Sequence, residues 1–128
     1  MEPVADTDAH AAPKEPLAFE AFLQRYDDAH AEWVNGEVVP KMPASVEHQD
    51  TSMFLLSLIV NWVAYHELGK VYHPPLLVKL PLPDTREVAR EPDIVVILNS
   101  NPGRFTAQYF DGAPDLIVEI VSPASRHI

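Results

Sequence analysis

Two continuous apolar runs, each associated with one acidic residue, constrain this 128-residue chain most strongly. The first run is 94–98 and directly follows Asp93; the second is 116–121 and contains Glu119 among five apolar residues. Runs of this kind are typical of central strands that are buried on both faces of a sheet. A carboxylate in such a place must be paired, protonated or bound to a metal, because an unpaired buried charge is costly.

Two buried strands that each carry an acidic residue at or near one end can bring Asp93 and Glu119 within reach of one metal ion. Mg²⁺ (or Mn²⁺) prefers oxygen ligands, and Mg²⁺ often needs only one or two protein carboxylates in addition to substrate phosphates. Structural roles are the alternative. Asp93 could accept hydrogen bonds from nearby backbone N–H groups, and Glu119 could form a salt bridge with Arg90, Arg86 or Arg126.

Composition limits the class of protein. The net charge of −10 weighs against a broad nucleic-acid-binding surface, although it leaves room for a local basic groove. Without cysteine there is no disulfide framework, thiolate nucleophile or thiolate zinc site. No apolar stretch approaches the roughly 18 residues of a membrane span, and the N-terminus does not resemble a signal peptide. These features favour a cytoplasmic protein that does not enter a membrane.

The length suits one domain. Residues 1–16 are rich in Ala, Pro and Asp, which predicts a disordered leader, and residues 17–128 form the predicted domain. Within 17–26, apolar residues recur at steps of three and four, which predicts an amphipathic helix.

The segment 31–39 predicts a β-hairpin. Asn35-Gly36 supplies the two positive-φ residues of a type I′ turn between two apolar stretches. Side chains alternate along a strand, so Glu32 and Trp33 should face opposite sides of the sheet.

A long helix is predicted from 46 to 68, with Ser45 as its N-cap and Gly69 as its C′ residue. Its wide apolar stripe predicts the main core helix. His48 lies in its first turn and His66 in its last; each is structural or solvated by default. His48 is the better functional candidate because a helix N-terminus faces anions favourably.

Beyond this helix, three prolines among apolar residues indicate an edge strand at 76–80. The segment 90–98 predicts the strand that carries Asp93. After the second apolar run, Ser122 to Ser125 are typical of the start of a further helix, and the chain ends at Ile128.

The order of these elements and two motifs resemble the Uma2 family, also called DUF820, a group of restriction-endonuclease-like proteins. The resemblance covers about Phe19 to Arg126. Its most specific parts are EPDIVVI at 91–97 and DGAPDLIVEIVSPASR at 111–126.

This resemblance implies an α+β fold of the PD-(D/E)XK nuclease type, in which helices flank a central mixed sheet. It implies a Mg²⁺ (or Mn²⁺) site and hydrolysis of phosphodiester bonds in nucleic acid, with DNA as the first candidate. Residue by residue, the family pattern makes Asp93 and Glu119 the metal carboxylates and Glu32 a supporting ligand. His48 matches a histidine at the head of the long helix.

The resemblance also implies a lysine that assists the attacking water. Val121 stands two residues after Glu119, where the nuclease pattern has this lysine, and in the Uma2 family the lysine is carried by the helix that follows. Lys70 and Lys79 are the only lysines after position 41, and the pattern assigns neither of them a role. We therefore expect a domain truncated at its C-terminal end, without its last helix and strand. An apolar patch left by that loss would favour a partner or a homodimer. The alternative to an endonuclease is a truncated or degenerate module that binds or oligomerises without catalysis.

Overall fold

The computed structural model describes residues 15–27, 29–84 and 86–121. The predicted leader (1–16) lies outside these ranges except for its last two residues, and so does the expected start of a helix at 122–125. Within the described ranges, the elements follow in the order α2 (Phe19–Arg25), β1 (Ala31–Val34), β2 (Glu37–Pro40), α3 (Val46–Tyr65), β3 (Gly69–Tyr72), β4 (Leu77–Pro81), β5 (Glu87–Arg90), β6 (Ile94–Leu98), β7 (Arg104–Phe105), β8 (Tyr109–Asp111) and β9 (Leu116–Val118).

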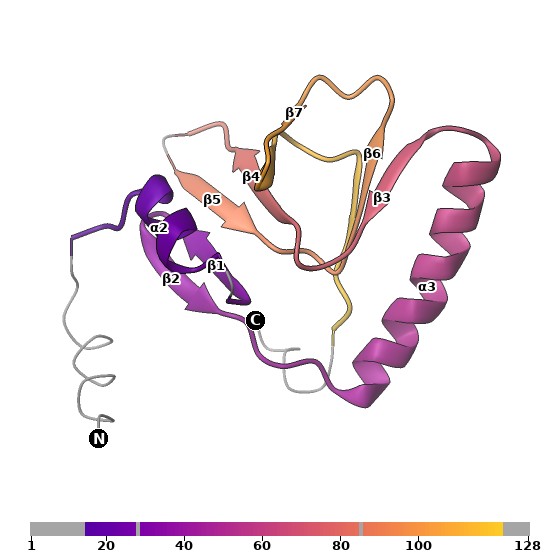
Figure 1. Cartoon of the computed structure of the whole chain (residues 1–128), viewed down its shortest axis with the longest axis horizontal. Helices are drawn as coiled ribbons and strands as arrows, with labels where there is room; N and C mark the ends of the chain where they lie inside the picture. The colour runs from indigo at the N-terminus through magenta and orange to yellow at the C-terminus, as the bar shows by residue number, and fades with distance from the viewer. Residues whose placement is uncertain (1–14, 28, 85, 122–128) are drawn as a thin grey trace.

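The strands form two sheets. One has six strands in the order β2-β1-β5-β4-β8-β7, and the other has three in the order β3-β6-β9. The larger sheet is mixed, because β4 and β8 run parallel while its other neighbours are antiparallel. Helix α2 lies beside the β1–β2 hairpin and α3 beside β3 (Figure 1). This arrangement confirms the predicted α+β class and is consistent with a restriction-endonuclease-like fold.

The hairpin forms as its sequence predicts. Asn35 has φ +52° and Gly36 has φ +92°, the left-handed conformation that a type I′ turn requires. Trp33 is buried against Phe19, and its indole N–H donates to the carbonyl oxygen of Leu17 at 2.8 Å. Glu32 faces the opposite side, as predicted, so the hairpin holds an apolar core on one face and a carboxylate on the other.

Gly36→Ala is expected to lower the free energy of unfolding by about 1 kcal/mol or somewhat more, because alanine disfavours positive φ. The added Cβ would also overlap Pro16. Asn35→Gly is the matched control, since glycine adopts the left-handed conformation without strain, and should change stability by only a few tenths of a kcal/mol. Chemical denaturation of both variants tests this. Equal stability of Gly36→Ala and the parent chain would contradict the assigned turn.

Two clusters of buried side chains make the core. The first joins α2 to the larger sheet: Phe19, Phe22, Ala31, Trp33 and Ala89. The second joins the two sheets: Val78, Val95, Ile97 and Phe110. In β6 every residue from Ile94 to Ile97 is buried, which confirms the prediction that 94–98 is a central strand. The second cluster fixes the position of β6 against the larger sheet.

The predicted strand 90–98 is in fact two strands. β5 ends at Arg90, β6 begins at Ile94, and the segment Glu91–Asp93 carries the chain from the larger sheet to the smaller one. Proline at position 92 cannot donate a ladder hydrogen bond, which suits this break. All three residues of the segment are buried, so two carboxylates lie at the junction of the sheets.

The predictions for β4 and β9 were wrong. β4 lies between β5 and β8, not at an edge, because its only proline, Pro81, is its last residue and the interior positions keep their N–H donors. β9 is short and lies at the edge of the smaller sheet within the described residues. Leu116 is 46% exposed and Ile117 37% exposed, so this run is not buried on both faces. An apolar sequence indicates that a strand is more stable when buried, but it does not determine whether another element covers that strand.

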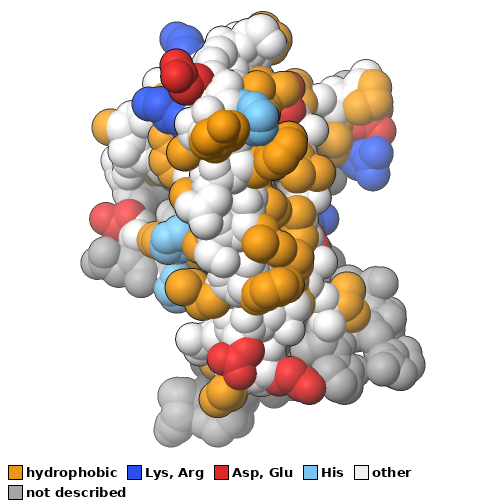
Figure 2. Space-filling view, turned by 90° about the vertical axis from the view of Figure 1, so that its right-hand side faces the viewer, with side chains coloured by type: hydrophobic (Ala, Val, Ile, Leu, Met, Phe, Trp, Pro, Cys, Tyr) orange, Lys and Arg blue, Asp and Glu red, His pale blue; other side chains and the backbone are white. Residues whose placement is uncertain are grey.

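The long helix begins as predicted but is not the main core helix. Ser45 caps it by accepting from the backbone N–H of His48 at 3.0 Å. Val63 is its buried residue, while several large apolar side chains are more than half exposed: Val46, Met53, Phe54, Leu58, Trp62 and Tyr65. Figure 2 shows apolar side chains gathered along this helix. Among the described strands, the helix makes its main contacts with β3, and most of its large apolar side chains stay exposed.

The end of this helix also differs from the prediction. Regular helix stops at Tyr65, and the left-handed residue is Glu67, with φ +52°. Gly69 instead begins β3. A Cβ there would overlap the carbonyl oxygen of Ile97, so this glycine permits close packing of β3 on β6 and does not terminate the helix.

Candidate functional site

Asp93 and Glu119 directly adjoin the last residue pair of the β6–β9 ladder, outside the two strands. The antiparallel β6–β9 ladder pairs Ile94 with Val118, and continuing this register by one residue places Asp93 opposite Glu119. Directly opposite residues point to the same face of an antiparallel pair, with Cβ atoms about 4.5–5.5 Å apart. The backbone N–H of Ile120 donates to Asp93 Oδ2 at 2.7 Å, which fixes the Asp93 carboxylate at the end of the ladder.

Glu32 is buried beside the same junction. Its Oε1 accepts from the Arg90 guanidinium at 3.0 Å, and its Oε2 accepts from the backbone N–H of Glu91 at 2.8 Å. The hairpin positions Glu32 at this junction, because β1 pairs with β5 and Trp33 occupies the opposite face of the strand. Both oxygens of Glu32 therefore have partners from the segment that leads to Asp93.

His48 reaches the site from the first turn of α3. Its Nε2 lies 3.2 Å from Asp93 Oδ2, close enough for a hydrogen bond that orients both side chains. Its Nδ1 is buried and has no hydrogen-bond partner among the described residues. Asp93 Oδ2 therefore contacts both the His48 ring and the Ile120 N–H. Asp93 Oδ1 has no hydrogen bond in the described part of the chain.

Lys41, Glu91 and His30 also line this region, and sequence analysis did not identify them as site residues. Lys41 Nζ donates to the carbonyl oxygen of Glu91 at 2.6 Å and lies 3.9 Å from Glu32 Oε2. The buried Glu91 carboxylate contacts His30 Nδ1 at 3.1 Å. The hairpin register contained a signal for Lys41: Val39 pairs with Glu32, so the residue two further along points to the same face.

The structure tests part of the structural roles predicted as alternatives for Asp93 and Glu119. Arg90 pairs with Glu32 and Arg86 with Asp84, at 3.0 Å and 2.8 Å, so neither forms the predicted salt bridge with Glu119. Arg126 lies outside the described residues. Asp93 does accept a backbone N–H, but the donor is Ile120 on the neighbouring chain segment. His66, by contrast, is exposed, and its ring lies tilted against that of Trp62 at the other end of α3.

Burial raises the pKa of the Glu119 carboxyl above its ordinary value. The charges of Asp93 and Glu32 raise it further, whereas the Lys41 ammonium and the backbone N–H of Asp93 act in the opposite direction. Glu119 as a residue is exposed and its carboxyl group is only partly desolvated, so solvent screens part of this effect. We call Glu32, Asp93 and Glu119, with Lys41 and His48, the acidic cluster.

The raised pKa predicts a pH-dependent gain in stability for Glu119→Gln. The folded state favours the protonated form, so ionised Glu119 lowers stability above its folded pKa, and this penalty vanishes below its ordinary pKa. Solvent exposure limits the gain at pH 7 to less than about 1 kcal/mol, or a rise of roughly 1–4 °C in Tm. The gain should disappear near pH 4, and Glu37→Gln on exposed β2 is the control. Lower stability of Glu119→Gln at pH 7 would contradict this assignment.

The donor atoms suit a hard divalent cation, because carboxylate oxygens are the ligands that Mg²⁺ prefers. Among the described residues, no three His, Asp or Glu side chains are close enough together to hold a metal ion. The cross-strand pair of Asp93 and Glu119 is compatible with a site of two protein carboxylates that water and phosphate complete. The chemistry of the cluster therefore fits such an ion without a preformed cage.

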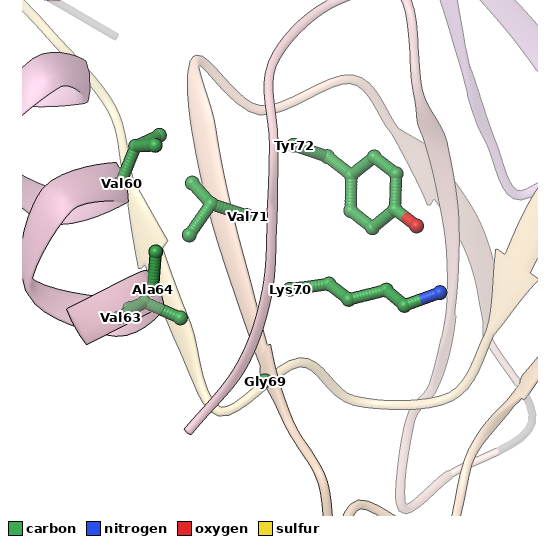
Figure 3. Close-up of a pocket in the computed structure, with 7 residues that line it drawn as sticks. All are labelled: Val60, Val63, Ala64, Gly69, Lys70, Val71 and Tyr72. Atoms are coloured by element: carbon green, nitrogen blue, oxygen red, sulfur yellow. The ribbon is translucent and has the colours of Figure 1, made fainter. Parts of the chain in front are cut away.

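A hollow between α3 and β3 differs in character from the acidic cluster. Val60, Val63 and Ala64 of the helix face Val71, while Lys70 and Tyr72 point to the other side of β3 (Figure 3). No carboxylate lines it. The hollow is apolar and is not part of the acidic cluster.

Comparison with known protein families identifies the relationship. The Uma2 family, described as "Putative restriction endonuclease", matches residues 19–127. The chain belongs to the Uma2 family. This confirms the resemblance seen in EPDIVVI and DGAPDLIVEIVSPASR, and it supports a nuclease-like function for the chain. No curated protein matches the sequence.

In this Uma2 chain, the acidic cluster combines the two family motifs with the hairpin and the head of α3. EPDIVVI contributes Asp93, and the second motif contributes Glu119. In the part of the chain that the structure describes, no helix has both the length and the apolar content needed to cross a membrane.

Proposed function

We propose that this chain is a divalent-metal-dependent endonuclease that hydrolyses phosphodiester bonds in nucleic acid, with DNA as the first candidate. The proposal is supported by the end of the β6–β9 ladder, where the last paired residues, Ile94 and Val118, adjoin Asp93 and Glu119. The charge of Asp93 raises the pKa of the Glu119 carboxyl, and a cation bound between the two carboxylates would relieve this repulsion. Membership of the Uma2 family supports the same chemistry.

In this proposal, Asp93 and Glu119 hold Mg²⁺ or Mn²⁺, and Glu32 supports them from β1. The bound ion would polarise the phosphate and lower the pKa of a water molecule. The contacts with Ile120 and His48 hold the Asp93 carboxylate in one orientation. Such support from surrounding residues keeps a metal ligand in place and costs little reorganisation during the reaction.

A nicking assay tests this function. Supercoiled plasmid should be converted to the open-circular form with Mg²⁺ or Mn²⁺, and EDTA should stop the reaction. Asp93→Asn, which retains the size of the side chain, should be inactive. Nicking that continues in EDTA, or that is equal in the parent chain and Asp93→Asn, would contradict the proposal.

The second candidate is a non-catalytic module that binds a partner or forms a homodimer. The exposed apolar side chains of α3, among them Phe54, Leu58 and Trp62, favour it because an apolar face of this kind lowers its free energy when covered. Sedimentation at several concentrations tests it: concentration-dependent dimers lost in Phe54→Ser would support this role, and a monomer throughout would oppose it. A cytoplasmic location belongs to both proposals, and cell fractionation would test it.

A further inference from the structure

Lys41 contributes the ammonium group of the acidic cluster. Its ammonium is 3.9 Å from Glu32 Oε2, and its charge also acts on Glu119. The Glu91 carbonyl oxygen accepts one of its three N–H groups at 2.6 Å, which holds the ammonium at the sheet junction. Its side chain is 25% exposed, so it is both anchored and accessible to a ligand.

Three other cations of the described chain have different environments. Lys79 lies over the Phe19 ring at 4.7 Å, and Lys70 lies over the Phe105 ring at 6.0 Å. Arg90 is already paired with Glu32 at 3.0 Å. The one hydrogen bond of the Lys41 ammonium goes to a neutral carbonyl, and its carboxylate contact is a long one. Lys41 therefore retains donors that can contact an anion.

We propose that Lys41 is the catalytic lysine of this chain and contacts the scissile phosphate. This inference rests on the proposed function and departs from the family pattern, in which the lysine follows the second strand. Lys41 directly follows β2. Its backbone N–H donates to the carbonyl oxygen of His30 at 2.9 Å, which extends the pairing of the hairpin by one residue. The position is thus determined by the Asn35-Gly36 turn.

In the proposed reaction, a water oxygen forms a bond to phosphorus and the bond from phosphorus to the leaving oxygen breaks. The water loses one proton to solvent, and the leaving oxygen takes up one proton from solvent. Lys41 remains an ammonium throughout and stabilises the charge that develops on the phosphate oxygens. Donors aimed at developing charge in this way contribute about 100-fold to 1000-fold in rate.

The test compares Lys41→Met, Lys41→Arg and Lys79→Met. Lys41→Met removes the charge and retains most of the length, Lys41→Arg restores a charge, and Lys79→Met removes a lysine outside the cluster. Three quantities are measured: the nicking rate, the Mn²⁺ affinity by calorimetry, and the salt dependence of binding to a DNA duplex with Ca²⁺ in place of Mg²⁺. Circular dichroism establishes that each variant is folded.

We expect the nicking rate of Lys41→Met to fall by about 100-fold or more, with Mn²⁺ affinity unchanged or higher because a competing charge is gone. The slope of log affinity against log salt should be less steep by about 0.9, the effect of one phosphate contact. Lys41→Arg should recover part of the rate, and Lys79→Met should match the parent chain.

Two outcomes would overturn the inference. If Lys41→Met nicks DNA at the parent rate while Asp93→Asn is inactive, the endonuclease stands and Lys41 is not its lysine. If Lys41→Met loses both Mn²⁺ binding and activity and Lys41→Arg does not recover them, Lys41 has a structural role. Failure of the proposed function looks different, because the parent chain itself would then neither bind Mn²⁺ nor nick DNA.

Discussion

Asp93→Ala is expected to reduce metal-dependent cleavage by at least about 100-fold, the range measured when a group that stabilises a transition state is removed. The carboxylate is one of the two proposed metal ligands beside the end of the β6–β9 ladder, so its loss leaves Glu119 alone as a ligand. The substitution also removes the acceptor for the Ile120 N–H, which costs about 1–2 kcal/mol in stability. Rates must therefore be compared per folded molecule, after measurement of the unfolding transition.

Asp115→Asn is the matched control for this prediction. Asp115 also accepts a backbone N–H across neighbouring segments, from Leu98 at 2.7 Å, and asparagine retains an oxygen acceptor. It lies away from the acidic cluster, so its variant should cleave at the parent rate. If Asp93→Ala and Asp115→Asn lose activity equally, the effect comes from the fold and Asp93 has no special role.

Glu32→Ala is expected to be the most destabilising single change in the cluster, by about 2 kcal/mol. Glu32 is only 8% exposed and satisfies the buried N–H of Glu91 at 2.8 Å. Alanine leaves this N–H without its partner, whereas the Arg90 side chain, 43% exposed, can turn to water. A loss of this size in a chain of this length lowers Tm by roughly 8–10 °C.

Glu37→Ala on the same hairpin is the control, because Glu37 is exposed on β2. Its Tm should change by no more than about 2 °C. Thermal unfolding followed by circular dichroism measures both variants. Equal Tm values for Glu32→Ala and Glu37→Ala would show that Glu32 does not hold the hairpin to the sheet junction.

Local turn chemistry and strand periodicity made the site predictable in part. Asn35-Gly36 fixed the hairpin and hence the face of Glu32, and the two acidic strands proved to be neighbours in one ladder. The sequence pattern does not indicate Lys41, because the family pattern has its lysine after Glu119. Its contact with the cluster depends on the register between two strands, which links residues far apart in sequence.

Burial was harder to predict than position. The apolar content of α3 and β9 indicated buried elements, but Phe54, Trp62 and Leu116 are all well exposed. Apolar residues specify that a surface benefits from being covered and do not specify which element covers it. The prediction that β4 is an edge strand was wrong for a related reason. It rested on the prolines of the segment around β4, although the interior positions of the strand keep the N–H groups that pair.

Calorimetric titration with Mn²⁺ tests the central claim, that Asp93 and Glu119 converge on a common ion. The parent chain should bind one ion, Asp93→Ala and Glu119→Gln should each lose the binding heat, and Asp115→Asn should retain it. Absence of binding in the parent chain, or the same affinity in Asp93→Ala, would contradict the account.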